Sequence, residues 1–108
     1  MRNNSKIFYG EFIGSCFLVM IIVGSGIMAQ NLTDDVAVML IANTLATGAG
    51  LFVLITSIGD ISGAHFNPVV TLAMYFTNKI KKNLIITYIS AQILGCMLGV
   101  MLANFMFD

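Results

Sequence analysis

The sequence carries very little charge. Asp, Glu, Lys and Arg make up 9% of its 108 residues, whereas a soluble globular domain carries about 25%. Hydrophobic residues make up 58%, and the mean hydropathy is +0.95. A soluble domain of this size could not bury so much apolar surface. The scarcity of charge therefore indicates that lipid surrounds most of the chain.

Residues that catalyse or bind metals are scarce as well. There is one histidine, His65, and there are two cysteines, Cys16 and Cys96. No set of Cys, Asp or Glu stands at metal-ligand spacing from His65, and no base–nucleophile pair is visible. Both cysteines lie in apolar runs, where we expect packing residues and no disulfide framework. The zero net charge offers no basic surface for nucleic acid. We therefore expect neither an enzyme nor a protein with a cofactor, metal or nucleic-acid partner.

Three stretches without charged residues, at roughly 12–29, 36–59 and 83–107, each reach the ~20 residues needed to cross a bilayer. They predict an all-α membrane protein with transmembrane helices over about residues 8–29, 36–59 and 84–107. The first stretch has a rival interpretation as a secretory signal. Its length, Glu11 at its border, and the glycines Gly24 and Gly26 inside it argue against a signal.

The segment 60–78 differs from the three spans. Residues 62–66 are too small and polar to open a spanning helix, whereas Asn67-Pro68 is typical of a helix start because Asn caps well and Pro lacks an N–H. A helix from Asn67 to Asn78 would reach roughly 17 Å, about half of a ~30 Å hydrocarbon core. The segment therefore predicts a re-entrant loop and half-helix that enters the membrane without crossing it.

The charges predict an orientation. Basic residues occur only before the first span and between the half-helix and the third span: Arg2, Lys6, Lys79, Lys81 and Lys82. Asp34 and Asp35 lie between the first and second spans, and Asp108 follows the third. Because Lys and Arg accumulate on the cytoplasmic side, we expect a cytoplasmic N-terminus. Helical spans favour an inner or plasma membrane over an outer membrane.

Small residues recur inside the spans. Gly10 and Gly14 are four residues apart, as are Gly95 and Gly99, and this spacing lets helix backbones approach closely in lipid. The second span has a patch of small residues that could serve tight packing or line a pore: Thr44, Ala46, Thr47, Gly48, Ala49 and Gly50.

The loop before the half-helix has the composition of a solute pathway. Irregular backbone at membrane depth is tolerated only where protein buries it or a water-filled cavity hydrates it. In such a cavity the loop carbonyls would form a row of acceptors, and Asn67 would add amide donors beside the partial positive charge of the helix N-terminus. That charge opposes cations and protons. If the loop faces a lumen, the segment predicts a pore for small neutral hydrogen-bonding molecules.

The run Ser-Gly-Ala-His-Phe-Asn-Pro-Val-Val-Thr at 62–71 resembles the first signature loop of the major intrinsic protein family, the aquaporins and glycerol facilitators. That signature is usually Ser-Gly-Ala-His-x-Asn-Pro-Ala-Val-Thr. Gly-Glu-Phe-Ile-Gly at 10–14 is similar to the Glu-Phe element of the family's first helix, and Ala91-Gln92 to the Ala-Gln pair of its third. The resemblance covers nearly the whole chain, and implies that residues 1–108 form the first inverted-repeat half of an aquaporin-like fold.

The resemblance implies roles for the loop. Asn67 would donate to the solute at mid-membrane, and Pro68 would start the half-helix. The carbonyls of Gly63, Ala64 and His65 would line the inner half of the pore, with the His65 carbonyl meeting the solute more than its ring.

Two residues outside the loop would hold it in place. The resemblance implies that Glu11 and Gln92 form hydrogen bonds to the loop. For Glu11 there is independent support, because a carboxylate at the edge of a span is costly unless it is partnered. Taken alone, Glu11 could also be an interfacial acid.

Two departures from the family pattern bear on the solute. Val69 replaces the usual Ala beside the mid-pore constriction, which puts the pore width there in question. Thr47 lies twenty residues before Asn67, where water-selective relatives carry an aromatic residue of the outer constriction. A small hydroxylated residue there suggests a wider, more polar filter that passes glycerol, urea, ammonia or undissociated metalloid hydroxides.

The largest departure is that a second Asn-Pro motif and a constriction arginine are absent, since Arg2 is the only arginine. Complete family members have six spans and two half-helices in inverted repeat. We expect a fragment or truncated form of a six-span channel, which would assemble as a homotetramer when complete. Alternatively, the chain is a half-channel that needs a separate inverted partner, because its Lys/Arg bias argues against an inverted homodimer. An ion-coupled transporter with a broken helix is a further alternative.

Overall fold

The computed structural model describes residues 3–107, and all regular structure among them is helical. The helices, in chain order, are α1 (Asn4–Leu32), α2 (Val36–Ser62), α3 (Pro68–Phe76) and α4 (Leu84–Phe107). Three of them, α1, α2 and α4, are long and apolar enough to cross a membrane. The nine residues of α3 reach only roughly 14 Å, about half of a ~30 Å hydrocarbon core. The predicted all-α class, with three long helices and one half-helix, is confirmed.

Side-chain caps set where the helices begin. Asn3 accepts a hydrogen bond from the Lys6 amide at 2.8 Å, and Asp35 accepts one from the Ala37 amide at 2.9 Å. These caps satisfy amides that have no partner within the helix. α1 extends beyond both ends of the expected span 8–29, whereas α2 begins at the expected residue 36 and extends beyond residue 59 to Ser62. The bounds of the membrane-embedded part within each helix stay predictions.

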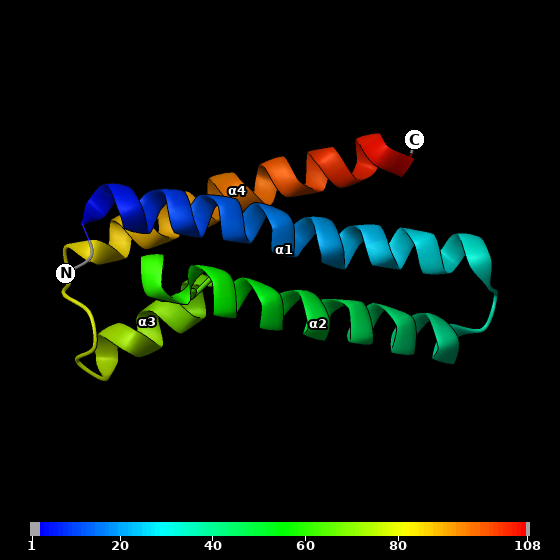
Figure 1. The fold of residues 1–108 in the computed structure, drawn as a ribbon, viewed down its shortest axis with the longest axis horizontal. Helices are drawn as coiled ribbons and strands as arrows, with labels where there is room; N and C mark the ends of the chain where they lie inside the picture. Colours follow the sequence, from blue (N-terminus) through cyan, green and yellow to red (C-terminus); the bar gives the residue numbers. More distant parts are fainter. Residues whose placement is uncertain (1–2, 108) are drawn as a thin grey trace.

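The chain folds back on itself after α2. Gly63 caps α2 with a φ of +94°, a left-handed conformation that glycine adopts without steric cost, and its amide donates to the Gly59 carbonyl at 2.8 Å. Residues 63–67, called here the re-entrant loop, turn inward, and α3 runs back to the end at which α2 finishes (Figure 1). The segment enters and leaves at one end of the molecule.

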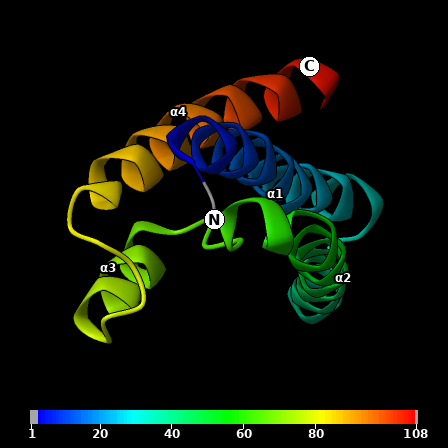
Figure 2. The same cartoon turned by 60° about the vertical axis from the view of Figure 1, so that its left-hand side comes forward.

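The helices make three pairwise contacts. α1 packs on both α4 and α2, whereas α3 contacts only α4. Viewed nearly along α1, α2 and α3 lie on the same side of the α1–α4 pair, well apart from each other (Figure 2). Within residues 3–107, α2 and α3 are thus joined by the re-entrant loop and by no helix–helix contact.

The two predicted glycine pairs behave differently. On α4, a Cβ at Gly95 would meet the Phe12 carbonyl oxygen and a Cβ at Gly99 would meet the Cys16 carbonyl oxygen. The α1 and α4 backbones therefore approach as closely as the spacing predicted. On α1, the space beside Gly10 is filled by the side chains of Ser62 and Ile58 at the end of α2, and the space beside Gly14 is filled by the Phe66 ring of the re-entrant loop. Neither glycine meets a helix backbone.

The charges of the two described helix connections lie toward opposite ends of the molecule. The connection from α3 to α4 carries Lys79, Lys81 and Lys82 and lies at the end where the chain begins (Figure 1). The connection from α1 to α2 carries Asp34 and Asp35 and lies at the other end. Arg2 and Asp108, which also entered the orientation argument, lie outside the described residues.

Candidate functional site

The re-entrant loop is held by one buried carboxyl group, that of Glu11 on α1. Its Oε2 accepts hydrogen bonds from Ser62 Oγ at 2.6 Å and from the His65 amide at 3.2 Å. Its Oε1 accepts from the Phe66 amide and from Gln92 Nε2, both at 2.8 Å. Glu11 is completely buried. All four partners are donors, so each carboxyl oxygen of Glu11 accepts two hydrogen bonds.

A second layer of polar contacts joins the loop to α3 and α4. Besides donating to Glu11, Gln92 Nε2 donates to Thr71 Oγ1 at 2.9 Å. The same hydroxyl lies 3.0 Å from His65 Nδ1. Glu11, Gln92, Thr71 and His65 are all buried. Through this network α1, α3, α4 and the loop share a common set of buried hydrogen bonds, in which Gln92 Oε1 is left without a partner among the described residues.

The His65 ring is held on its flat face as well. Its plane stacks on Tyr88 of α4, with ring centroids 4.1 Å apart and an interplanar angle of 9°. The Tyr88 hydroxyl in turn donates to the carbonyl oxygen of Ser62, which is the last residue of α2. His65 is only 8% exposed, so its ring is engaged by neighbours and is turned away from open space.

The loop backbone is strained where it turns. Ala64 (φ +53°) and Phe66 (φ +55°) both adopt left-handed conformations, which cost non-glycine residues about 1–3 kcal/mol each. The Ala64 amide donates to Ser62 Oγ at 3.1 Å, and the Phe66 amide donates to Glu11. These bonds offset the strain. The carbonyl oxygens of Gly63 and Ala64 accept no hydrogen bond from any described residue, so both are free to accept from a solute or water.

Asn67 stands at the start of α3 with a fixed amide orientation. Its Oδ1 accepts from the Val69 amide at 2.8 Å, and Pro68 occupies the first helical turn. Because the oxygen is committed to the cap, the NH₂ group points away from the helix. Asn67 is exposed, and within residues 3–107 its Nδ2 donates to no partner. Val69 is 71% exposed beside it.

Thr47 is placed apart from these residues, on α2. Asn43, one turn earlier, donates to the Ile22 carbonyl of α1 at 2.8 Å, and a Cβ at Gly50, one turn later, would lie 2.6 Å from Ile21 Cδ1. Thr47 therefore lies near the side of α2 that faces α1. Its hydroxyl is covered and has no hydrogen-bond partner among the described residues. Its role in a filter stays a prediction.

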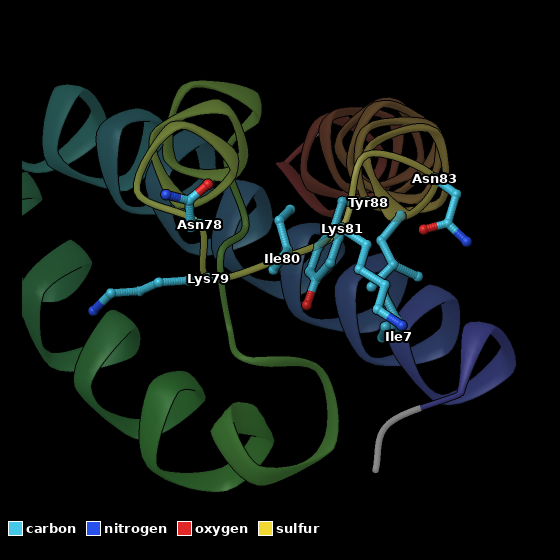
Figure 3. Close-up of a pocket in the computed structure, with 8 residues that line it drawn as sticks. Ile7, Asn78, Lys79, Ile80, Lys81, Asn83 and Tyr88 are labelled. Carbon is cyan, nitrogen blue, oxygen red and sulfur yellow. The ribbon is translucent and has the colours of Figure 1, made fainter.

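A pocket of about 560 Å³ opens at the basic end of the molecule, beside Lys79 and Lys81. Its walls come from the start of α1, the α3–α4 connection and the first turns of α4, and Figure 3 shows that Lys79 points away from Tyr88. Tyr88 borders this pocket and also contacts the loop through its hydroxyl. Tyr88 thus connects the hydrogen-bond network of the loop to the pocket at the basic end of the molecule.

Five residues of the arrangement were not singled out as site residues from the sequence: Gly14, Ser62, Phe66, Thr71 and Tyr88. Ser62, Phe66 and Thr71 lie inside the quoted motif, where only the pore positions drew attention. Tyr88 had a usable signal, since it lies one turn before Gln92 on the face of α4 that also buries Gly95 and Gly99. Gly14 had none, because its partner is a loop and no helix spacing predicts that contact.

Comparison with known proteins gives one consistent result. The model of the family described as Major intrinsic protein matches residues 2–108. Aquaglyceroporin AqpS of Rhizobium meliloti is 48% identical over 98 residues, which cover 91% of this chain and 42% of that protein. Aquaporin A of Dictyostelium discoideum is 35% identical over 94 residues, covering 87% of this chain and 34% of its own length. Aquaporin-4 of Rattus norvegicus is 35% identical over 89 residues, covering 82% and 28%. The chain spans less than half the length of these curated relatives.

Proposed function

Because this chain belongs to the major intrinsic protein family, we propose that it forms one half of a passive transmembrane channel for water or small neutral solutes. The observation that supports this most strongly is the geometry of Asn67. Its carbonyl oxygen is committed to capping α3, its NH₂ group is unpaired within the described chain, and the residue is exposed. A solute acceptor atom that reaches the start of α3 meets a ready donor.

The surrounding backbone supports the same role. The unpaired carbonyls of Gly63 and Ala64 offer acceptors just ahead of the Asn67 donors. The N-terminus of α3 adds partial positive charge at the same place. A molecule that both donates and accepts hydrogen bonds can exchange its water partners for these groups, whereas a cation or a hydrated proton is repelled.

A second half is part of the proposal. α2 and α3 make no direct contact, and Ser62 is the only buried residue of α2 in the described structure. Three spans and one half-helix do not enclose a pore alone. We therefore place a second channel half, of opposite orientation, against the side shared by α2 and α3. It is either the continuation of this chain or a separate chain. Complete channels would then associate as homotetramers in the lipid bilayer.

The proposed orientation puts the basic end in the cytoplasm. Lys79, Lys81 and Lys82 gather at the end where the chain begins, and the acidic pair Asp34 and Asp35 lies at the other. Cationic residues near span ends are retained on the cytoplasmic side. A multi-pass protein of an inner or plasma membrane with a cytoplasmic N-terminus satisfies this distribution.

For the solute, we propose a filter wider than one selective for water alone. Thr47 supplies a small hydroxylated side chain where water-selective relatives are expected to carry an aromatic ring. The name of the bacterial relative, aquaglyceroporin, points to glycerol as well as water. Glycerol, urea, ammonia and undissociated metalloid hydroxides share the small size and neutral hydrogen bonding that such a filter admits.

The decisive experiment for the pore role uses Asn67→Asp in the native protein that contains this chain. Reconstituted into proteoliposomes at equal protein content, the variant should lose most water and glycerol flux, because a carboxylate replaces the NH₂ donor. Asn83→Asp makes the same change at the start of α4, away from the loop, and should keep the flux. Equal flux in the two variants would show that Asn67 does not face the pathway.

The filter proposal has its own experiment, Thr47→Phe. A ring at this position should narrow the pathway and lower glycerol flux more than water flux, measured by stopped-flow light scattering. An unchanged glycerol-to-water ratio would mean that Thr47 does not border the pathway, in keeping with its side chain remaining between α1 and α2.

The coding sequence beyond Asp108 tests the second-half proposal directly. A frame that continues to a second Asn-Pro motif and a nearby arginine would supply the missing half within one polypeptide. A native product whose intact mass matches 108 residues would require a separate partner of opposite orientation, which crosslinking in native membranes should then capture. Failure to capture any partner of such a product would contradict the proposal.

A further inference from the structure

The glycine pair on α1 receives the end of α2 and the re-entrant loop that follows it. A Cβ at Gly10 would lie 2.8 Å from Ser62 Cβ, so no side chain larger than hydrogen fits there without a shift. A Cβ at Gly14 would lie 2.5 Å from Cζ and 2.8 Å from Cδ1 of the Phe66 ring. Real Cβ atoms essentially never approach other atoms so closely. The Phe66 ring thus fills the space that the missing side chain of Gly14 leaves.

Phe66 is fixed at its backbone as well as at its ring. Its amide donates to Glu11 Oε1 at 2.8 Å, and its φ of +55° is one that a bulky residue rarely adopts. The side chain is only 5% exposed. Glu11 and Gly14 lie nearly one turn apart on α1. One short stretch of α1 therefore holds Phe66 at two points, its backbone amide and its ring.

The residue that follows Phe66 is Asn67, whose side chain makes one hydrogen bond among the described residues, the cap to the Val69 amide. Asn67 is exposed, and α3 behind it contacts only α4 among the described helices. On the α1 side, the last fixed point before Asn67 is the ring of Phe66 against Gly14. Because Phe66 and Asn67 are joined by one peptide unit, a displacement of this ring would shift the side-chain NH₂ group of Asn67, which we place in the pathway.

We propose that the contact between Phe66 and Gly14 is a positioning device that sets the depth and angle at which Asn67 presents its NH₂ group. Gly14 and Phe66 are then selectivity-determining residues that never touch the solute. This inference rests on the proposed channel function. It goes beyond that function by assigning the geometry of the solute site to an aromatic ring and a glycine on a different helix.

The first test is Gly14→Ala in the native protein that contains this chain, with water and glycerol permeabilities measured on the same proteoliposomes. The added methyl group pushes the ring away, so the glycerol-to-water ratio should change at least about threefold, a size that coupling between contacting residues commonly reaches. Gly26→Ala is the matched control on the same helix. Its Cβ would lie 3.6 Å from Asn43 Nδ2, an ordinary contact, and the ratio should stay unchanged.

The ratio separates positioning from a purely structural role. A variant that merely lowers the number of folded channels reduces both permeabilities by one factor and leaves their ratio unchanged. Combining Gly14→Ala with Phe66→Leu makes room for the methyl group, because Leu reaches less far than a phenyl ring. The double variant should return the ratio at least halfway to the native value.

If Gly14→Ala does not fold, Phe66→Leu alone provides the measurement, since it leaves the space beside Gly14 partly empty. We expect the same change in ratio, together with faster hydrogen exchange of the Phe66 and Asn67 amides. A native ratio in every folded variant would overturn the inference. If Asn67→Asp still abolishes flux in that case, the channel function stands and only the positioning role falls. If Asn67→Asp also leaves flux unchanged, the proposed function itself has failed.

Discussion

Helix α1 makes two contacts of opposite chemical character. Toward α4 it presents backbone, with the carbonyl oxygens of Phe12 and Cys16 lying against Gly95 and Gly99. Toward the re-entrant loop it presents Glu11, whose carboxyl group accepts four hydrogen bonds. The first contact depends on the absence of side chains. The second depends on one side chain with a full set of donors around it.

The difference follows from the backbone hydrogen-bonding groups that α4 and the re-entrant loop each leave without an internal partner. A helix has satisfied its own backbone, so α4 needs only close van der Waals contact and small residues to pack on α1 in lipid. The re-entrant loop has no such internal pairing, and its amides at His65 and Phe66 would be left unsatisfied at membrane depth. Glu11 satisfies both. The α1–α4 contact depends on the absence of side chains at Gly95 and Gly99, whereas the placement of the loop depends on the positions of hydrogen-bond donors and acceptors.

Removing the carboxyl group should have the largest effect. In Glu11→Ala, four donors lose their acceptor, and each buried unsatisfied donor costs about 1–3 kcal/mol. The loop should leave its position, with flux lost and thermal stability in detergent greatly reduced. Glu11→Gln keeps the shape but brings a donor among donors, so its loss should be smaller. If Glu11→Ala kept native flux and stability, the polar half of the comparison would be wrong.

Filling the helix contact should have an intermediate effect. In Gly95→Leu the side chain meets the Phe12 carbonyl oxygen, which belongs to a helix backbone and cannot rotate away. The α1–α4 pair should separate slightly and lose about 1–3 kcal/mol, while the loop hydrogen bonds lengthen. The melting temperature in detergent measures this loss. Gly48→Leu is the control because its Cβ meets nothing within 4 Å, and equal melting temperatures in the two variants would contradict close α1–α4 packing.

Removing one hydrogen bond that does not involve Glu11 should have the smallest effect. Tyr88→Phe removes the bond to the Ser62 carbonyl and keeps a ring to stack on His65. We expect a loss of about 1 kcal/mol and a modest decrease in flux. Tyr9→Phe makes the same change at a residue that is 64% exposed, and should be neutral. A loss as large as that of Glu11→Ala would mean that Tyr88, and not Glu11, is the main support of the loop.

Several parts of this architecture could be predicted without coordinates. The three long helices follow from charge-free apolar runs, and the start of α3 follows from the Asn67-Pro68 pair. The α1–α4 contact follows from Gly95 and Gly99, because a four-residue spacing of glycines has one simple use in lipid. Each of these features depends on residues that lie close together in the sequence.

Other parts could not be predicted in this way. Gly10 and Gly14 have the same spacing as the α4 pair, yet they make room for Ser62 and Phe66. Glu11 and Gln92 are eighty-one residues apart, so only the family resemblance suggested that both support the loop. Thr47 was expected at a filter, and the structure places its hydroxyl in a covered position near α1. In each case the answer depends on which distant segment arrives at the residue.

By itself, the sequence determined that lipid surrounds the chain, how many helices form and which residue caps α3, because hydropathy and local hydrogen bonding act over a few neighbouring residues. Only the tertiary structure decided that one glycine pair would meet a helix backbone and the other the side chains of Ser62 and Phe66, and that the Asn67 NH₂ group would be exposed and without a partner among the described residues. Those outcomes depend on contacts between α1, α4 and the re-entrant loop, which no local pattern encodes.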